Sequence, residues 1–261
     1  MSSLSLAARD TSTMLRRNLL HARRYPSLTL NLLLTPIMLL LLFVYIFGDT
    51  MSAGIGGGDR SDYIAYLVPG LLLMTIGSTT IGTAVSVSTD MSEGIIARFR
   101  TMAIHRGSVI TGHVIGSVIQ SVISVVLVGA VGVAIGFRST DATALEWLAA
   151  FGLLTLFALA LTWIAVGMGM VSPNAEAASN NAMPLIFLPL ISSTFVPVDQ
   201  MPGWFQPIAQ YQPFTPAIET LRGLLLGTEI GYNGWLAVAW CLGLAALGYF
   251  WSKAVFNRDP K

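Results

Sequence analysis

Charged side chains are scarce in this sequence. Asp, Glu, Lys and Arg together make up 10% of its 261 residues, whereas hydrophobic residues make up 54%. Soluble domains carry about 25% charged residues and about 45–50% apolar residues. A soluble core cannot absorb this excess of apolar side chains, so the composition excludes an ordinary soluble domain and indicates a membrane protein.

Residues that build catalytic and metal sites are equally few. Cys241 is the only cysteine, which excludes an intrachain disulfide and a cysteine-based zinc site, and we interpret it as a small buried residue. No two of the three histidines have H-x-x-x-H spacing. Neither Lys253 nor Lys261 follows a glycine, as the lysine of a phosphate-binding loop must. We therefore expect no enzymatic site, no cofactor and no nucleic-acid partner for this chain.

Six long runs contain no Asp, Glu, Lys or Arg. They are 25–48, 63–89, 107–137, 147–175, 177–198 and 230–252. Each run reaches the roughly 20 residues that cross about 30 Å of hydrocarbon as a helix. A further run, 200–218, carries four prolines that would break a spanning helix. The sequence therefore predicts an all-α integral membrane protein with six transmembrane helices, the first of which is too long to be a cleaved signal segment.

Basic residues are distributed unequally between the two sides of such a bundle. The three on one side are Arg60, Arg138 and Arg222, and the eleven on the other are Arg9, Arg16, Arg17, Arg23, Arg24, Arg98, Arg100, Arg106, Lys253, Arg258 and Lys261. Cytoplasmic loops carry the excess of Lys and Arg, so we expect both termini to be cytoplasmic. Twelve arginines against two lysines favour a GC-rich bacterial gene, and hence a bacterial cell membrane.

Residues 1–25 form an amphipathic pattern. Helical spacing gathers Leu4, Met14, Leu15 and Leu19 on one face, and the opposite face carries Arg9, Arg16, Arg17, Arg23 and Arg24. This pattern predicts an interfacial helix on the cytoplasmic leaflet, with a solvated tail as the alternative.

A second amphipathic segment, EGIIARFRTMAIHRG, separates the second and third runs at residues 93–107. It is too short and too charged to span the membrane, yet Ile95, Ile96, Phe99 and Met102 form an apolar stripe. The segment is either a loop whose arginines set the topology or a helix that docks on a cytoplasmic partner.

Two stretches resemble the daunorubicin-resistance permease subunits, a branch of the type-2 ABC exporters. They are DMSEGIIARFRTMAIHRGSVITGHVIG, residues 90–116, and SSTFVPVDQMPGWFQPIAQYQPFTPAIETLRGLLLG, residues 192–227. The resemblance implies a cytoplasmic coupling helix that docks in a cleft of an ATP-binding subunit, formed here by Glu93, Gly94, Ile95, Ile96, Arg98, Phe99, Arg100, Met102 and Ile104. It also implies two ATP-binding subunits, which hold the ATP and Mg, and a second permease copy or close paralogue.

The proline-rich segment 201–227 follows the fifth run. Trp204, Phe205 and Tyr211 suit an interfacial aromatic belt. Thr215 is the expected N-cap of a helix with Pro216 at its first position, and Pro213 precedes both. Glu219 lies near the positive end of this helix and Arg222 follows one turn later. Gly227 suits the C-terminal end of the helix. About 11 helical residues span roughly 16 Å, half a bilayer. We expect two outer re-entrant half-helices, which the family also has; a cap lying flat on the headgroups is the alternative.

Ionisable side chains are nearly absent inside the expected spans. Only His113 lies there, and we interpret it as a packed or hydrogen-bonded helix residue. The driving energy should therefore come from another subunit.

We accordingly expect a single permease domain, 1–261, comprising the amphipathic helix 1–25, the bundle 26–254 and the tail 255–261. The function that the resemblance implies is export of a hydrophobic, drug-like small molecule from a bacterial cell. The alternatives are a permease for a lipid or a cell-surface glycan, and a membrane scaffold without transport activity.

Overall fold

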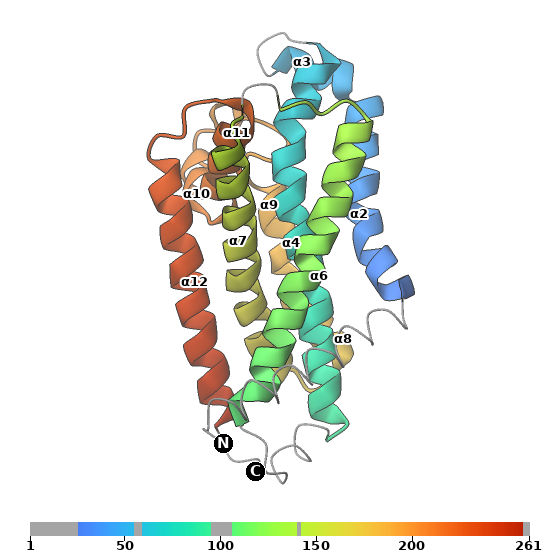
Figure 1. Cartoon of the computed structure of the whole chain (residues 1–261), viewed down its shortest axis with the longest axis vertical. Coiled ribbons are helices and arrows are strands. Elements are labelled where there is room, and N and C mark those ends of the chain that lie inside the picture. Colours follow the sequence, from blue (N-terminus) through green and yellow to red (C-terminus); the bar gives the residue numbers. More distant parts are fainter. Residues whose placement is uncertain (1–25, 55–58, 95–105, 140–141, 258–261) are drawn as a thin grey trace.

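The computed structural model describes residues 26–54, 59–94, 106–139 and 142–257. In these residues the regular structure is helical throughout, without strands. The long helices stand side by side, so the described chain forms an elongated bundle (Figure 1).

The bundle has two ends, which we name after the short helices that lie there. The long helices are α2 Pro26–Tyr45, α4 Arg60–Ser92, α6 Arg106–Ala134, α7 Ala144–Val171 and α12 Asn233–Phe256. The short elements are α3 Gly48–Gly54, α8 Ala175–Ala182, α9 Pro184–Leu190, the 3-10 turn η1 Val198–Gln200, α10 Gln206–Tyr211 and α11 Phe214–Leu226. Helix α4 ends and α6 begins at the α8 end, whereas α4 begins and α6 ends at the α11 end (Figure 1).

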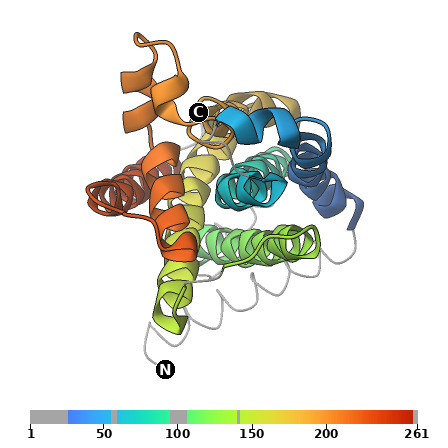
Figure 2. The same cartoon turned by 90° about the horizontal axis from the view of Figure 1, so that it is seen from above.

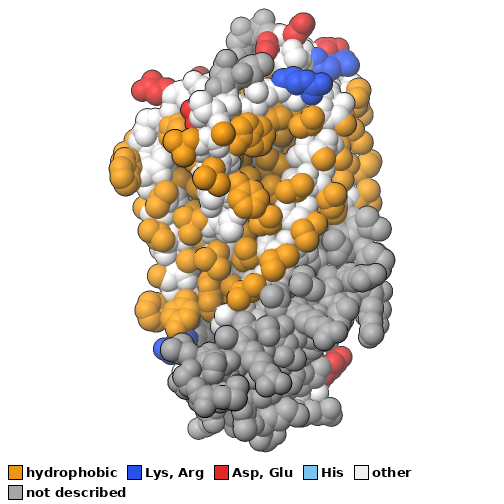
Figure 3. Space-filling view, in the orientation of Figure 1, with side chains coloured by type: hydrophobic (Ala, Val, Ile, Leu, Met, Phe, Trp, Pro, Cys, Tyr) orange, Lys and Arg blue, Asp and Glu red, His pale blue; other side chains and the backbone are white. Residues whose placement is uncertain are grey.

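Four described helices, α4, α6, α7 and α12, are long and apolar enough to cross a membrane. The 28 residues of α7 extend about 42 Å, more than the hydrocarbon thickness. On the described part of the face in Figure 3, hydrophobic side chains form a band and charged side chains lie toward its two ends. These features agree with the predicted all-α membrane bundle, while the count of six spans stays a prediction.

The fifth predicted span is not one continuous helix. The structure divides it into α8 and α9, because Pro184 has no backbone N–H to continue the helical ladder and instead begins α9. Run 177–198 is free of charge but not uniformly apolar, since it contains Ser179, Asn180 and Asn181. The sequence predicts a span that Pro184 and Pro189 kink or offset, and the structure goes further by dividing the run into two helices.

Helix α4 is the centre of the bundle. Within its most apolar window 83% of the residues are buried, compared with 17% in α12, which lies outside α7. Seen from above, α4 lies between α2, α6 and α7 (Figure 2). Its side chains Tyr63, Leu67 and Leu71 share one core with Phe157 of α7 and Phe214 of α11. Helix α4 is thus the longest described helix, and it contacts α2, α3, α6, α7, α8, α9 and α11.

Close approach of α9 to α4 requires a glycine. A Cβ atom added to Gly77 would lie 2.5 Å from the carbonyl oxygen of Leu185 and 3.8 Å from the ring of Phe214. The oxygen belongs to the backbone and cannot rotate away as a side chain could. This contact therefore fixes how deeply the broken fifth segment sits against α4.

We predict that Gly77→Ala destabilises the protein by about 1–3 kcal/mol, because the added methyl group overpacks the contact between α4 and α9. Reversible unfolding in mixed detergent micelles measures the loss. Gly152→Ala in α7 is the matched control, since a Cβ there meets nothing within 4 Å. Equal stability of the two variants would contradict the packing that we describe.

Candidate functional site

The α8 end contains the start of the predicted coupling helix. Helix α4 ends at Ser92, the N–H of Glu93 donates to the carbonyl of Thr89 over 2.9 Å, and Gly94 has a positive φ of 69°. Residues Ile95, Ile96, Arg98, Phe99, Arg100, Met102 and Ile104 lie outside the described residues. So do Arg16, Arg17, Arg23 and Arg24 of the predicted interfacial helix. The two predicted helices therefore remain predictions.

A buried polar pair joins the helices on either side of that segment. His113 Nε2 of α6 lies 2.9 Å from Asp90 Oδ2 of α4, and the two side chains are 7% and 9% exposed. The expectation that His113 is a packed or hydrogen-bonded helix residue is confirmed. The structure adds Asp90, one residue beyond the charge-free run 63–89, as a second ionisable side chain at the level of His113. That His113 is the only ionisable residue within the hydrocarbon stays a prediction.

At the other end, segment 201–227 forms two short helices, α10 and α11, as expected. Gly227 has a φ of 70° and ends α11, which confirms it as the stop, because glycine adopts this left-handed conformation without strain. Whether the two helices dip into the membrane stays a prediction.

Thr215 is not the N-cap of α11. The helix begins at Phe214, whose N–H donates to Gln212 Oε1 over 3.1 Å, so the side chain of Gln212 satisfies the first N–H of the helix. Thr215 Oγ1 instead accepts from the backbone N–H of Ser193 and from Gln212 Nε2. The hydroxyl that the pattern assigned to its own helix thus binds a different segment.

The aromatic residues of this segment lie at its surface. Trp204 is 76% exposed and packs edge to face on Phe205, with ring centroids 5.4 Å apart. The indole N–H of Trp240 in α12 donates to the carbonyl of Tyr211 over 2.9 Å. Pro213 precedes α11, and Pro216 lies in its first turn, where a missing N–H costs no helical hydrogen bond.

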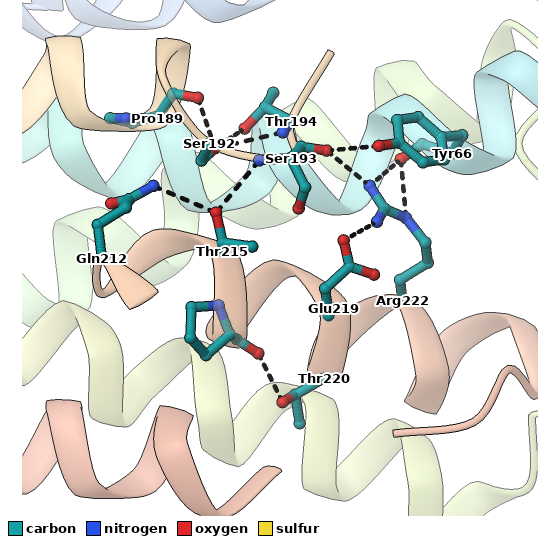
Figure 4. Close-up of polar contacts among 11 residues, drawn as sticks. Tyr66, Pro189, Ser192, Ser193, Thr194, Gln212, Thr215, Glu219, Thr220 and Arg222 are labelled. Carbon is teal, nitrogen blue, oxygen red and sulfur yellow. Dashed lines mark hydrogen bonds and ion pairs between the residues drawn. The ribbon is translucent and has the colours of Figure 1, made fainter. Parts of the chain in front are cut away.

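Arg222 of α11 is the main polar contact of this end (Figure 4). Its Nη1 donates to Glu219 Oε1 over 2.6 Å, and its Nε and Nη2 donate to the backbone carbonyl of Tyr66 in α4 over 3.3 and 3.0 Å. Nη2 also donates to the carbonyl of Ser193 over 3.1 Å. The guanidinium lies 3.7 Å from the centre of the Tyr66 ring, a cation–π distance. The sequence counted Arg222 as a charge of one side; the structure buries it, with 6% of the residue exposed.

The non-helical stretch after α9 is held by these contacts. The carbonyl of Ser193 accepts from Tyr66 Oη and from Arg222, and its N–H donates to Thr215. Ser192 Oγ donates to the carbonyl of Pro189 and lies 2.8 Å from Thr194 Oγ1. A buried stretch without helical hydrogen bonds needs such partners. The contacts of residues 192–194 with α4 and α11 therefore supply these hydrogen-bond partners (Figure 4).

Uncharged polar groups join helices in the middle of the bundle. Thr79 Oγ1 of α4 lies 2.7 Å from Ser121 Oγ of α6, which agrees with the expectation that such groups mediate helix contacts. No group of three or more His, Cys, Asp and Glu side chains that could hold a metal occurs in the part of the chain that the structure describes. The described residues thus form a packed helical bundle in which buried hydrogen bonds join the helices at both ends, through Asp90 and His113 at the α8 end and through Arg222 at the α11 end.

Comparisons with known proteins agree with this architecture. The profile of the family described as ABC-2 type transporter matches residues 9–226. The chain is 28% identical to the daunorubicin resistance ABC transporter permease protein DrrB1 of Streptomyces coeruleorubidus over 245 residues, which are 92% of this chain and 83% of the relative.

Two other relatives extend the comparison. The probable doxorubicin resistance ABC transporter permease protein DrrC of Mycobacterium tuberculosis is 23% identical over 60% of this chain and 58% of its own length. Nodulation protein J of Rhizobium meliloti is 25% identical over 82% of both chains. The profile match, together with four apolar helices of spanning length, shows that this chain is a multi-pass membrane protein of the ABC-2 type transporter family.

Proposed function

We propose that this chain is the permease subunit of an ATP-driven exporter that moves a hydrophobic or amphipathic, drug-like compound out of a bacterial cell. The observation that carries the proposal is the similarity to a daunorubicin resistance permease along 92% of the chain. The similarity to a doxorubicin resistance permease supports the same cargo class. ATP hydrolysis takes place on a separate subunit, because neither lysine of this chain has the glycine-rich context of a phosphate-binding loop.

The partners follow from this assignment. The family implies an ATP-binding subunit. Two copies of it serve two permease chains, which are either identical or close paralogues. Residues 93–104 are the coupling helix, and the α8 end, where α4 stops and α6 starts, faces the ATP-binding subunit. The α8 end and both termini are cytoplasmic, since that side carries eleven of the fourteen basic residues.

The α11 end then faces outward. Ten residues of α11 are buried, and Arg222 binds the helix to α4 through the backbone carbonyl of Tyr66. Burial and internal hydrogen bonding are what a re-entrant helix requires at membrane depth. A helix lying flat on headgroups would leave a polar face to water. We therefore favour the re-entrant arrangement of α10 and α11.

A lipid or a cell-surface glycan is the alternative cargo. Not every relative is named for drug resistance, since Nodulation protein J matches 82% of this chain. In this case the same permease plan and the same coupling helix would serve a larger, amphipathic substrate. A scaffold that recruits a partner without transport is the third possibility, and it differs in having no cargo.

Reconstitution tests the proposal directly. The purified chain alone should show no saturable ATP binding, whereas the chain purified with its cognate ATP-binding subunit should accumulate daunorubicin in inside-out proteoliposomes on addition of ATP and Mg. A complex that forms but moves neither daunorubicin nor lipid supports the scaffold. Movement of a labelled lipid without daunorubicin supports the alternative cargo.

Phe99→Asp should uncouple the complex without unfolding the permease. A charge at the docking contact would be buried unpaired at a cost of several kcal/mol, and each 1.4 kcal/mol weakens binding about tenfold. The variant should insert normally but lose co-purification with the ATP-binding subunit or lose export. Arg98→Ala is the matched control, because an exposed ion pair contributes about 0–1 kcal/mol. Full export by Phe99→Asp would show that the segment only sets the topology.

Single cysteines test the orientation in a Cys241→Ser background. Asp59→Cys and Ser139→Cys, both at the α11 end, should react with an impermeant thiol reagent in intact cells, whereas Arg98→Cys should react only after the membrane is opened. The basic asymmetry is the physical reason. Labelling of position 98 from outside would overturn the topology.

A further inference from the structure

The α8 end has a hydrophobic cluster of its own, separate from the main core. It consists of Val87, Ile110, Val114, Val166, Met170 and Phe256. These residues come from the last turns of α4, the first turns of α6, the end of α7 and the end of α12. Four helix ends therefore form a packed unit next to the segment between α4 and α6.

Asp90 and His113 belong to the same faces as this cluster. Val87 lies one turn before Asp90 on α4, and Ile110 and Val114 flank His113 on α6. The pair joins α4 and α6 over 2.9 Å, two residues before α4 ends at Ser92 and seven residues after α6 begins at Arg106. Apolar contacts between helices permit small rotations and sliding, whereas a hydrogen bond between buried polar side chains specifies one register.

The last turns of α4 also contact the junction between α7 and α8. Ser88 Oγ donates to the carbonyl of Ser172 over 3.4 Å, and Asn181 Nδ2 of α8 donates to Ser172 Oγ over 2.9 Å. A Cβ on Gly169 of α7 would lie 2.5 Å from the carbonyl of Ala84, so the two backbones are in direct contact there. Helix α4 is thus joined to α7 and α8 on one side, and through Asp90 to α6 on the other.

We propose that Asp90 and His113 are a positioning pair, which locks the ends of α4 and α6 together so that a displacement of the segment between them moves both helices as one unit. The inference rests on the proposed function, in which the ATP-binding subunit docks on residues 93–104. Without the pair, residues 93–104 would still dock on the ATP-binding subunit. Their displacement would then let α4 and α6 slide past each other instead of moving the two helices together. Nucleotide-driven change would then fail to reach the α11 end.

Thiol labelling of a cysteine at position 139 reports on the α11 end. Ser139 follows α6, and its hydroxyl donates to the carbonyl of Leu225 in α11. In a Cys241→Ser, Ser139→Cys chain reconstituted with the ATP-binding subunit, ATP and Mg should change the thiol labelling rate about fivefold or more, as for a typical allosteric coupling. Asp90→Ala and His113→Ala should abolish this change while co-purification with the ATP-binding subunit persists. The double exchange Asp90→His, His113→Asp restores the pair in reverse and should recover the response.

Ser121→Ala is the matched control. It removes the hydrogen bond to Thr79, which joins the same two helices in mid-bundle, and it should leave the response intact. An equal loss in Ser121→Ala, or an unchanged response in both alanine variants, would overturn the inference. If the alanine variants fail to insert, Asp90→Leu decides, because leucine is of similar size but cannot hydrogen-bond to His113: a reduced response supports the pair, and an unchanged response contradicts it.

The outcome for the parent chain separates the two proposals. The parent chain carries only Cys241→Ser and Ser139→Cys. If it does not bind the ATP-binding subunit, the proposed function is overturned, and with it this inference. A parent chain that binds but shows no response at position 139 overturns the inference alone, since the displacement should reach the far end of α6.

Discussion

The interior of a bilayer offers no hydrogen-bond partners, so a buried polar group must find its partner within the protein. This constraint accounts for the positions of the polar contacts in the bundle. Arg222 binds a carboxylate and two backbone carbonyls, His113 binds Asp90, and Thr79 binds Ser121. The hydroxyls of Ser124 and Ser193 are the exceptions among the described side chains. A buried polar group that loses its partner costs about 1–3 kcal/mol, so such contacts favour one register of the helices.

The same constraint explains how the chain can leave helical structure between α9 and α11. A non-helical stretch is tolerated inside a membrane protein only where other parts of the protein satisfy its backbone. Ser193 meets this condition, because its carbonyl and its N–H bind Tyr66, Arg222 and Thr215. The prolines that interrupt the fifth segment thus create a need for hydrogen-bond partners, and α11 meets it. The fold of segment 201–227 and the non-helical stretch 192–194 therefore depend on each other.

The sequence predicted the helices better than it predicted their contacts. Runs 63–89, 107–137, 147–175 and 230–252 correspond to α4, α6, α7 and α12, because a continuous apolar run is the dominant determinant of a spanning helix. The fifth run was predicted as one span kinked or offset at its prolines, whereas the structure divides it into two helices at Pro184. Its lack of charge did not make it apolar, since it contains Ser179, Asn180 and Asn181. Arg222 was placed on the correct segment, but its partners are backbone carbonyls, which no side-chain pattern records. Asp90 and His113 are 23 residues apart on different helices, so their contact depends on a register that single-helix periodicity does not contain.

Helix α4 connects the two polar ties. Tyr66 accepts from Arg222 near its start, and Asp90 binds His113 near its end, 24 residues and about 36 Å further along. Between them apolar neighbours bury the helix, and Thr79 and Ser88 add hydrogen bonds to Ser121 and Ser172. A tightly packed helix transmits axial displacement with little internal change, since protein interiors have low compressibility. A helix that is tightly packed along its length and hydrogen-bonded near both ends therefore suits the mechanism that we propose, in which a separate subunit supplies the energy at one end of the bundle.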